Sequence, residues 1–197
     1  MMARIPNILT VTRILLVPVF VVLFFVGGLW RSYGATGVFA MAALTDWADG
    51  YLARRYQGVS PFGTFLDPVA DKLMVSTALV LICASKEMSS VILAGVLTSI
   101  IVGREITVSA LREWMAEIGE RVKVSVSWLG KVKATLQMLA ILFLVYQGQL
   151  IGFSSQKIGI VFLILAAGMT LWSMVGYLRA AWPSLTGVAA NLDSRQE

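Results

Sequence analysis

Four aspartates stand as two closely spaced pairs within a short stretch of an otherwise apolar chain. Asp46 and Asp49 are three residues apart, and Asp67 and Asp71 are four residues apart. On a helix, both spacings place the two carboxylates of a pair on one face, one turn apart. A charged side chain at the centre of a bilayer costs about 3 kcal/mol on insertion scales, so clustered acids require cations or bound metal beside them. This stretch is therefore the first candidate for the chemistry of the chain.

Small residues accompany the first acidic pair. Gly50 and Ala53 share the helical arc of Asp46 and Asp49, so a bulky ligand can approach the backbone closely there. The loop between the two pairs contains Gly58, Pro61 and Gly63, which favour a reversal of the chain. We therefore expect the two acidic pairs to face each other from neighbouring helices.

Carboxylate oxygens on two facing helices favour a hard divalent cation, Mg²⁺ or Mn²⁺. About four negative charges would be balanced by two such ions. The sequence has no histidine and one cysteine, which excludes His-based zinc sites, Ser-His-Asp triads and an intramolecular disulfide. Spacing alone leaves three interpretations open: metal-assisted catalysis, a cation-transport pathway, and a structural network that pairs the acids with Arg54, Arg55 and Lys72.

Membrane helices are the elements that must position these residues. The chain has 197 residues, of which 58% are hydrophobic, and it suits one domain over residues 1–197. We expect an all-α, polytopic membrane protein with six transmembrane helices and an N-terminal juxtamembrane segment. Each of six apolar stretches is long enough to cross a core of roughly 30 Å. The stretches are Leu9–Val26, Gly34–Tyr56, Asp67–Ser85, Ser89–Glu117, Ser127–Tyr146 and Lys157–Trp182.

The distribution of positive charge predicts the orientation. Six crossings place both termini on one side, and of the 16 Lys and Arg residues only Arg31, Lys86 and Lys157 fall on the other side. The positive-inside rule then makes both termini and the acidic stretch cytoplasmic. The net charge of +5 favours an anionic membrane surface or an anionic substrate over nucleic acid, because the basic residues punctuate apolar segments.

The acidic stretch fills the pattern D-x2-D-G-x2-A-R-x8-G-x3-D-x3-D without departure. Its eight fixed positions are Asp46, Asp49, Gly50, Ala53, Arg54, Gly63, Asp67 and Asp71. This pattern resembles the signature of the CDP-alcohol phosphotransferase family. The resemblance implies a six-helix enzyme, usually a homodimer, in a bacterial-type inner membrane, which transfers a phosphatidyl or similar group from a CDP-linked donor to an alcohol. It also implies that the four aspartates bind two divalent ions, and that Asp71 removes the proton of the acceptor hydroxyl.

The same resemblance implies a set of donor contacts. Arg54 offers a planar guanidinium that suits phosphate. Upstream, Asn7, Thr10 and Arg13 recur every three residues on one helical arc, and the family places this segment beside the nucleotide. For Asn7, an N-terminal helix cap is the alternative role. The residues expected to contact the nucleotide are Asn7, Thr10, Gly50, Ala53, Arg54, Ser60 and Gly63.

A second polar concentration lies downstream, in R-E-I-T-V-S-A-L-R-E at 104–113 and G-K-V-K at 130–133. Arg104, Arg112, Lys131 and Lys133 interrupt otherwise apolar helices there. The two lysines are about 200° apart on a helix, so both cannot point straight into one pocket. Contact with lipid headgroups is one interpretation. Basic groups opposite a metal-bound donor favour the other interpretation, an anionic acceptor.

These two segments resemble the phosphatidylglycerophosphate synthase branch of the family. That branch uses CDP-diacylglycerol as donor and sn-glycerol 3-phosphate as acceptor, and the resemblance implies that Arg104, Arg112, Lys131 and Lys133 hold the acceptor phosphate. Alternatives remain. A sibling that uses inositol phosphate would also need a basic pocket, and one that uses serine or choline would need fewer cations. A cation transporter could use the same aspartates without a nucleotide.

Overall fold

The structure is a computed structural model that describes residues 4–56, 61–85, 91–118, 128–150 and 152–185. Helices account for nearly all of it. They are α1 (Arg4–Val26), the π-helix η1 (Trp30–Ala35), α2 (Thr36–Tyr56), α3 (Pro61–Ala84), α4 (Val91–Glu117), α5 (Trp128–Tyr146) and α6 (Ser155–Leu185). The strands β1 (Gln149–Leu150) and β2 (Phe153–Ser154) form a short antiparallel hairpin between α5 and α6. The all-α prediction is confirmed.

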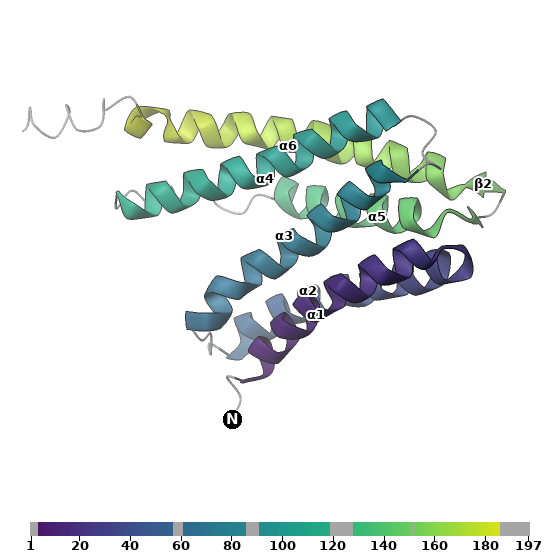
Figure 1. The fold of residues 1–197 in the computed structure, drawn as a ribbon. Coiled ribbons are helices and arrows are strands. Elements are labelled where there is room, and N and C mark those ends of the chain that lie inside the picture. Colours follow the sequence, from purple (N-terminus) through teal and green to yellow (C-terminus); the bar gives the residue numbers. More distant parts are fainter. Residues whose placement is uncertain (1–3, 57–60, 86–90, 119–127, 151, 186–197) are drawn as a thin grey trace, which may run out of the picture.

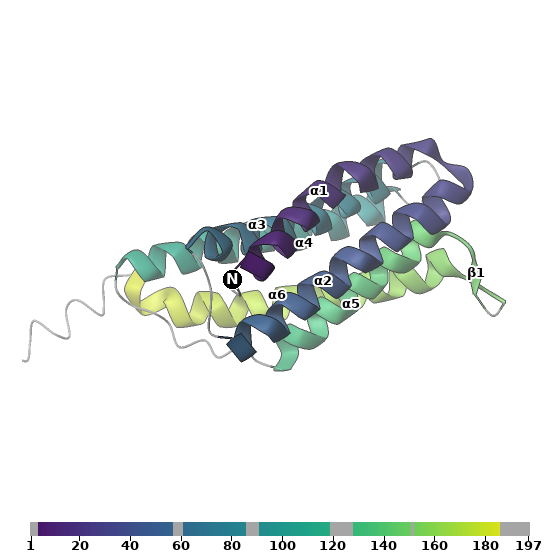
Figure 2. The same cartoon turned by 90° about the horizontal axis from the view of Figure 1, so that it is seen from below.

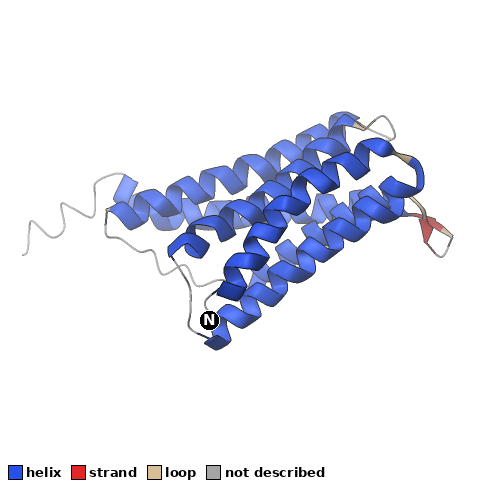
Figure 3. Ribbon diagram, turned by 60° about the horizontal axis from the view of Figure 1, so that its bottom comes forward, coloured by secondary structure: helices blue, strands red, loops and turns tan. Residues whose placement is uncertain are grey.

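The six α-helices form an elongated bundle in which successive helices run in opposite directions (Figures 1 and 2). The start of α1 and the end of α6 lie at the same end of the bundle, together with the end of α2 and the start of α3. The β1–β2 hairpin lies at the opposite end (Figure 3). This alternation places the acidic stretch and the C-terminal half of α4 toward one end of the molecule.

Apolar side chains occupy both the inside and the outside of the bundle. Phe20, Leu79 and Ile141 from three different helices are fully buried in one core cluster. On the outside, Ile92 is 81% exposed and Trp172 is 77% exposed. A helix that is apolar all round is typical of a membrane span, because lipid solvates its outer face.

Three described helices are long and apolar enough to cross a membrane. The candidate spans are Leu9–Val26, Val91–Glu117 and Ser155–Arg179. Two shorter apolar stretches, Lys72–Ala84 and Val132–Tyr146, belong to α3 and α5. The protein is therefore membrane-embedded, and three of the six predicted crossings are supported by length and composition. The other three crossings stay a prediction.

The N-terminal segment is helical from Arg4 onward. Residues Arg4–Val26 form one continuous helix, so the predicted juxtamembrane segment is the first part of α1 and no break separates it from the span. Asn7 consequently lies inside α1, three residues after its start, and is not the N-terminal cap. Pro18 is also inside this helix, as membrane helices tolerate.

Helices α5 and α6 form the most extensive interface of the bundle, and it depends on a glycine. A Cβ atom added to Gly159 would lie 2.6 Å from Leu144 Cγ and 3.1 Å from the backbone oxygen of Ala140. The first neighbour can rotate, but the second is main chain and can give way only if the helices separate. Small residues at such crossings let two helix backbones approach closely in membranes.

We expect Gly159→Ala to destabilise the protein by about 1–3 kcal/mol, the usual cost of overpacking a tight contact. Gly168→Ala on the same helix is the matched control, since a Cβ atom there has no heavy atom within 4 Å. The measurement is the midpoint of thermal unfolding of each purified variant in one detergent. Equal midpoints for Gly159→Ala and Gly168→Ala would contradict this account of the α5–α6 contact.

Candidate functional site

The acidic stretch is divided between two helices that touch each other, α2 and α3. Helix α2 carries Asp46, Asp49, Gly50, Ala53 and Arg54 in its C-terminal part, and α3 carries Gly63, Asp67 and Asp71 in its N-terminal part. The predicted juxtaposition of the two helices is therefore present in the backbone. Ser60 lies outside the described residues. The side chains that also lie outside the description are those of Asn7, Asp49, Gly50, Ala53, Arg54, Gly63, Asp67, Asp71 and Lys131.

Asp46 forms an ion pair with Arg13 of α1. The Arg13 side chain is only 3% exposed, whereas that of Asp46 is 42% exposed. A guanidinium buried among apolar helices needs an anion nearby, because an uncompensated buried charge is strongly destabilising. Thr10, one turn before Arg13, is also fully buried. The predicted arc of α1 thus lies against the start of the acidic motif.

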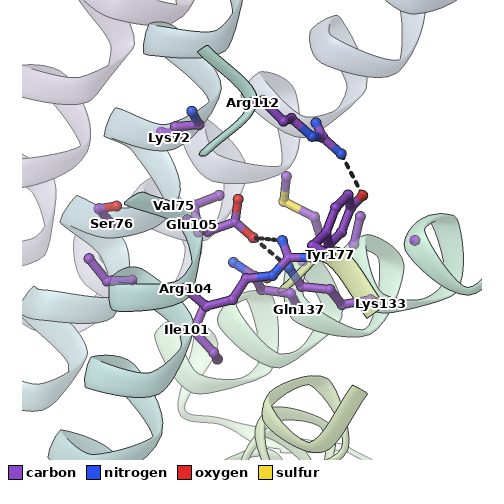
Figure 4. Close-up of a pocket in the computed structure, with 14 residues that line it drawn as sticks. Lys72, Val75, Ser76, Ile101, Arg104, Glu105, Arg112, Lys133, Gln137 and Tyr177 are labelled. Atoms are coloured by element: carbon purple, nitrogen blue, oxygen red, sulfur yellow. Dashed lines mark hydrogen bonds and ion pairs between the residues drawn. The ribbon is translucent and has the colours of Figure 1, made fainter. Parts of the chain in front are cut away.

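A separate polar cavity of about 260 Å³ opens between α3, α4, α5 and α6 (Figure 4). Three of the four basic residues predicted to bind the acceptor line it: Arg104 and Arg112 from α4, and Lys133 from α5. The sequence excluded a common direction for Lys131 and Lys133 but did not choose between them. Lys133 is the one whose described side chain lines the cavity.

One carboxylate oxygen organises part of this cavity. Glu105 Oε1 accepts from Arg104 Nη1 at 3.1 Å and also from Lys133 Nζ. The Arg104 and Lys133 side chains are 10% and 7% exposed, and that of Glu105 is 28% exposed. Figure 4 shows both contacts converging on the same end of the Glu105 side chain. Two nearly buried cations are therefore held by one acid, which leaves excess positive charge.

Helix α6 supplies neutral partners to both arginines. Arg104 Nη2 donates to Ser173 Oγ at 2.8 Å, and Arg112 Nη2 donates to the hydroxyl of Tyr177. The guanidinium carbons of Arg104 and Arg112 lie 5.4 Å and 4.9 Å from the centre of the Tyr177 ring. A cation over an aromatic face is attracted by the ring without being neutralised. The contacts with α6 thus position both arginines without adding a counter-charge.

Lys72 brings another cation to the wall of the cavity, from α3. Its Nζ donates to Ser109 Oγ, and Ser109 Oγ in turn donates to the backbone oxygen of Glu105 at 2.7 Å. The sequence offered a role for Lys72 in one of three open interpretations, as a structural partner of the acids together with Arg54 and Arg55. Its position directly after Asp71 could have indicated a separate location, because consecutive residues on a helix point about 100° apart.

Sequence reasoning assigned no role to Glu105, Ser173 or Tyr177. Glu105 follows Arg104 directly in the same basic segment. It is seven residues before Arg112, which places the two on nearly the same face of a helix, and this spacing could have identified Glu105 as part of the site. Ser173 and Tyr177 are four residues apart on α6 and so share one face, but nothing in their local sequence points to α4 as their partner.

The polar cavity adjoins the acidic motif. Val75 and Met138 line both this cavity and a smaller one beside Arg13 and Asp46. On α3, the backbone position of Asp71 is one turn before Val75 and about 40° from it around the helix axis. A cavity lined by four cationic side chains therefore borders the helix that carries two of the motif's acids.

The chain is similar over most of its length to known proteins of one family. A family model described as CDP-alcohol phosphatidyltransferase matches residues 3–181. A protein of Pseudomonas fluorescens named CDP-diacylglycerol–glycerol-3-phosphate 3-phosphatidyltransferase is 50% identical over 184 residues, which cover 92% of this chain and 92% of that protein. Proteins of the same name from Escherichia coli (strain K12) and Shigella flexneri are each 45% identical over 181 residues, covering 92% of this chain and 96% of theirs.

We expect inorganic phosphate to raise the thermal unfolding midpoint of the detergent-solubilised protein, because a ligand that binds only the folded state stabilises it. At a phosphate concentration about ten times its Kd, the stabilisation is about 1.4 kcal/mol. Arg112→Ala should lose most of this shift. Arg179→Ala should keep it, since Arg179 is exposed on α6 and does not line the cavity. Sodium chloride at matched ionic strength controls for screening, and an undiminished shift in Arg112→Ala would contradict an anion site here.

Proposed function

Because the chain belongs to the CDP-alcohol phosphatidyltransferase family, we propose that it transfers the phosphatidyl group from CDP-diacylglycerol to sn-glycerol 3-phosphate. The products are phosphatidylglycerophosphate and CMP, and the process served is phospholipid biosynthesis. The observation that carries the choice of acceptor is the cavity beside the motif, where Arg104, Arg112 and Lys133 converge. Relatives with the corresponding name, 45–50% identical over most of their length, support the same choice.

The acceptor phosphate binds among the cations of the cavity. Arg112 keeps its charge beside Tyr177, and Arg104 and Lys133 share one acid between them. Within the part of the chain that the structure describes, Arg104 Nε is buried without a hydrogen-bond partner. A buried unpaired N–H on a cation is costly, and a phosphate oxygen is a suitable acceptor for it. Lys131 belongs to the proposed acceptor set on sequence grounds.

The donor lies on the motif side. Gly50, Ala53 and Gly63 let the nucleotide approach the backbone, and Arg54 and Ser60 contact the diphosphate, with Asn7 and Thr10 on the facing arc of α1. The buried position of Thr10, one turn from the ion pair between Arg13 and Asp46, supports this placement of α1. The acyl chains remain in the lipid that surrounds the bundle.

Divalent metal ions accompany this family, and the chain's residues fit them. Asp46, whose carboxylate is partly exposed at the α1–α2 contact, and the helix positions of Asp49, Asp67 and Asp71 present only hard oxygen donors. We assign these four aspartates as ligands of two ions, Mg²⁺ or Mn²⁺. When bound, the ions stabilise the negative charge that develops on the phosphoryl oxygens.

The transfer is a substitution at phosphorus. The hydroxyl oxygen of glycerol 3-phosphate forms a bond to the phosphorus that carries the diacylglycerol, and the bond from that phosphorus to the bridging oxygen breaks. CMP departs with the electron pair of that bond. Asp71 takes the hydroxyl proton, a role that suits its helix position one turn from the wall of the acceptor cavity. The basic cavity holds the acceptor in the orientation required for this attack, which lowers the entropic part of the activation barrier.

The site belongs on the cytoplasmic side of a bacterial inner membrane. The proposed topology has six crossings with both termini cytoplasmic, which follows from the concentration of Lys and Arg on one side. The helix directions agree, because the start of α1 and the end of α6 lie at the same end of the bundle (Figures 1 and 2). CDP-linked donors and phosphorylated acceptors are available on that side. A homodimer is proposed on the family resemblance alone.

The direct test incubates purified protein with CDP-diacylglycerol, Mg²⁺ and one acceptor at a time, and measures released CMP. We expect rapid release with glycerol 3-phosphate and slow release with inositol phosphate, serine or choline. Faster release with inositol phosphate would reassign the acceptor. Absence of CMP with every acceptor would favour the cation-transport alternative, which requires no nucleotide.

Asp71→Asn should reduce turnover by several orders of magnitude, because an amide cannot take the hydroxyl proton. Donor binding should persist, and it can be followed as the thermal shift produced by CDP-diacylglycerol without acceptor. A variant that retains turnover would remove Asp71 from the role of base. Loss of donor binding together with turnover would instead place its main effect in the metal and nucleotide site.

A further inference from the structure

We propose that Glu105 is the positioning residue of the acceptor site: its carboxylate holds Lys133 and Arg104 in the geometry that receives the acceptor phosphate. The proposal rests on the proposed function and deepens it, because it explains how several cations are kept ordered in one cavity before the acceptor arrives.

The arrangement requires such a group. Lys72, Arg104, Arg112 and Lys133 bring four positive charges to one cavity between helices, and among the lining residues that the structure describes Glu105 is the one acid. Like charges repel strongly where water is scarce, since the interaction grows as the dielectric constant falls. Long basic side chains also retain large rotamer freedom when nothing restrains them. A carboxylate at the centre opposes both effects.

The contacts of Glu105 leave N–H donors of Lys133 and Arg104 available to a ligand. Among the described residues, only Oε1 is used, by Lys133 Nζ and Arg104 Nη1. An ammonium group has three N–H donors, so Lys133 keeps donors for a ligand. Arg104 also donates from Nη2 to Ser173 Oγ, and its Nε has no hydrogen-bond partner among the described residues. Glu105 thus removes freedom from two cations without using all of their donors.

Arg112 is organised independently. Its described contacts are with the hydroxyl and ring of Tyr177, and none is with Glu105. Loss of the Glu105 carboxylate should therefore disorder the Lys133–Arg104 part of the site and leave the Arg112 part in place. Acceptor binding should weaken without disappearing.

The sign of the effect distinguishes positioning from simple charge balance. Removal of a negative charge from a cavity that binds an anion increases the long-range attraction of the acceptor. If this attraction dominates acceptor binding, the acceptor KM falls. Loss of positioning raises the KM, because the acceptor phosphate must then order the two side chains itself. Since both cations are nearly buried and already paired with the carboxylate, the second effect should win.

The experiment compares Glu105→Gln with wild type and with Glu117→Gln, which changes an exposed acid near the end of the same helix that does not line the cavity. We expect Glu105→Gln to raise the KM for glycerol 3-phosphate roughly tenfold, which corresponds to about 1.4 kcal/mol. Its KM for CDP-diacylglycerol should be unchanged, and its kcat at saturating acceptor should fall much less than tenfold. Glu117→Gln should match wild type. An unchanged or lowered acceptor KM in Glu105→Gln would overturn the proposal.

If Glu105→Gln folds too poorly for kinetic assays, a second measurement, of phosphate binding, tests the proposal. The thermal shift produced by inorganic phosphate should be reduced in Glu105→Gln, and Lys133→Met should reduce it too. In the double variant the two losses should overlap, because the carboxylate acts through this lysine. Fully additive losses would show that Glu105 does not act through Lys133 and would overturn the proposal.

Arg112→Ala, assayed in parallel, separates the role of Glu105 from the assignment of the cavity as the acceptor site. If Arg112→Ala raises the acceptor KM and Glu105→Gln does not, the acceptor site stands and the role of Glu105 fails. If neither variant changes the acceptor KM, the cavity is not the acceptor site, and the proposed function of these residues fails with it.

Discussion

The need to compensate charge inside an apolar bundle is the constraint on which the rest of this structure depends. A cation between membrane helices is stable only if another group restrains and solvates it. Arg13 meets this condition through Asp46, and Lys133 meets it through Glu105. Arg112 does so differently, through the ring and hydroxyl of Tyr177. Each solution ties together two different helices, so the charges that serve the chemistry also fix the packing at this end of the bundle.

The use of unequal partners gives the cavity its character. If every cation had its own carboxylate, the cavity would be neutral and would have little affinity for an anion. Here one carboxylate serves two cations, and aromatic or hydroxyl groups serve others. Positive charge is therefore ordered but not cancelled. This is the property required of a site that must capture a phosphomonoester from water and hold it against a lipid-linked donor.

Helix α3 joins the two halves of the site. Its N-terminal part carries two of the motif's aspartates, and the next turns contribute Lys72, Val75 and Ser76 to the cavity. Because Val75 also borders the small cavity beside Asp46, the proposed donor and acceptor sides lie against the same helix. A rigid helix between the two sides fixes the distance and direction from the acceptor to the proposed base, which a loop would hold less firmly.

Much of this organisation was predictable from local pattern. The apolar lengths predicted the positions of the helices to within a few residues at most ends, and the motif spacing placed its acids on the facing helices α2 and α3. Those properties depend on the period of a helix and on the energetics of lipid, both of which act over a few residues. The motif likewise predicted the family, which the matching family model confirms. The continuity of α1 through Asn7 was missed, since its first turns lack the apolar composition that marks a span.

The partners of the basic residues were decided by the tertiary structure. Arg104 meets Ser173 across 69 positions of sequence, Arg112 meets Tyr177 across 65, and Lys133 meets Glu105 across 28. No local periodicity encodes such pairs, because they depend on which helices pack together and at what rotation. Helical geometry indicates that Lys131 and Lys133 point apart, but only the packing of α5 against α3 and α6 placed Lys133 in the wall of the cavity. Residue types and their spacing along a helix thus identify the chemistry, whereas the rotation and contact of whole helices select which side chains meet.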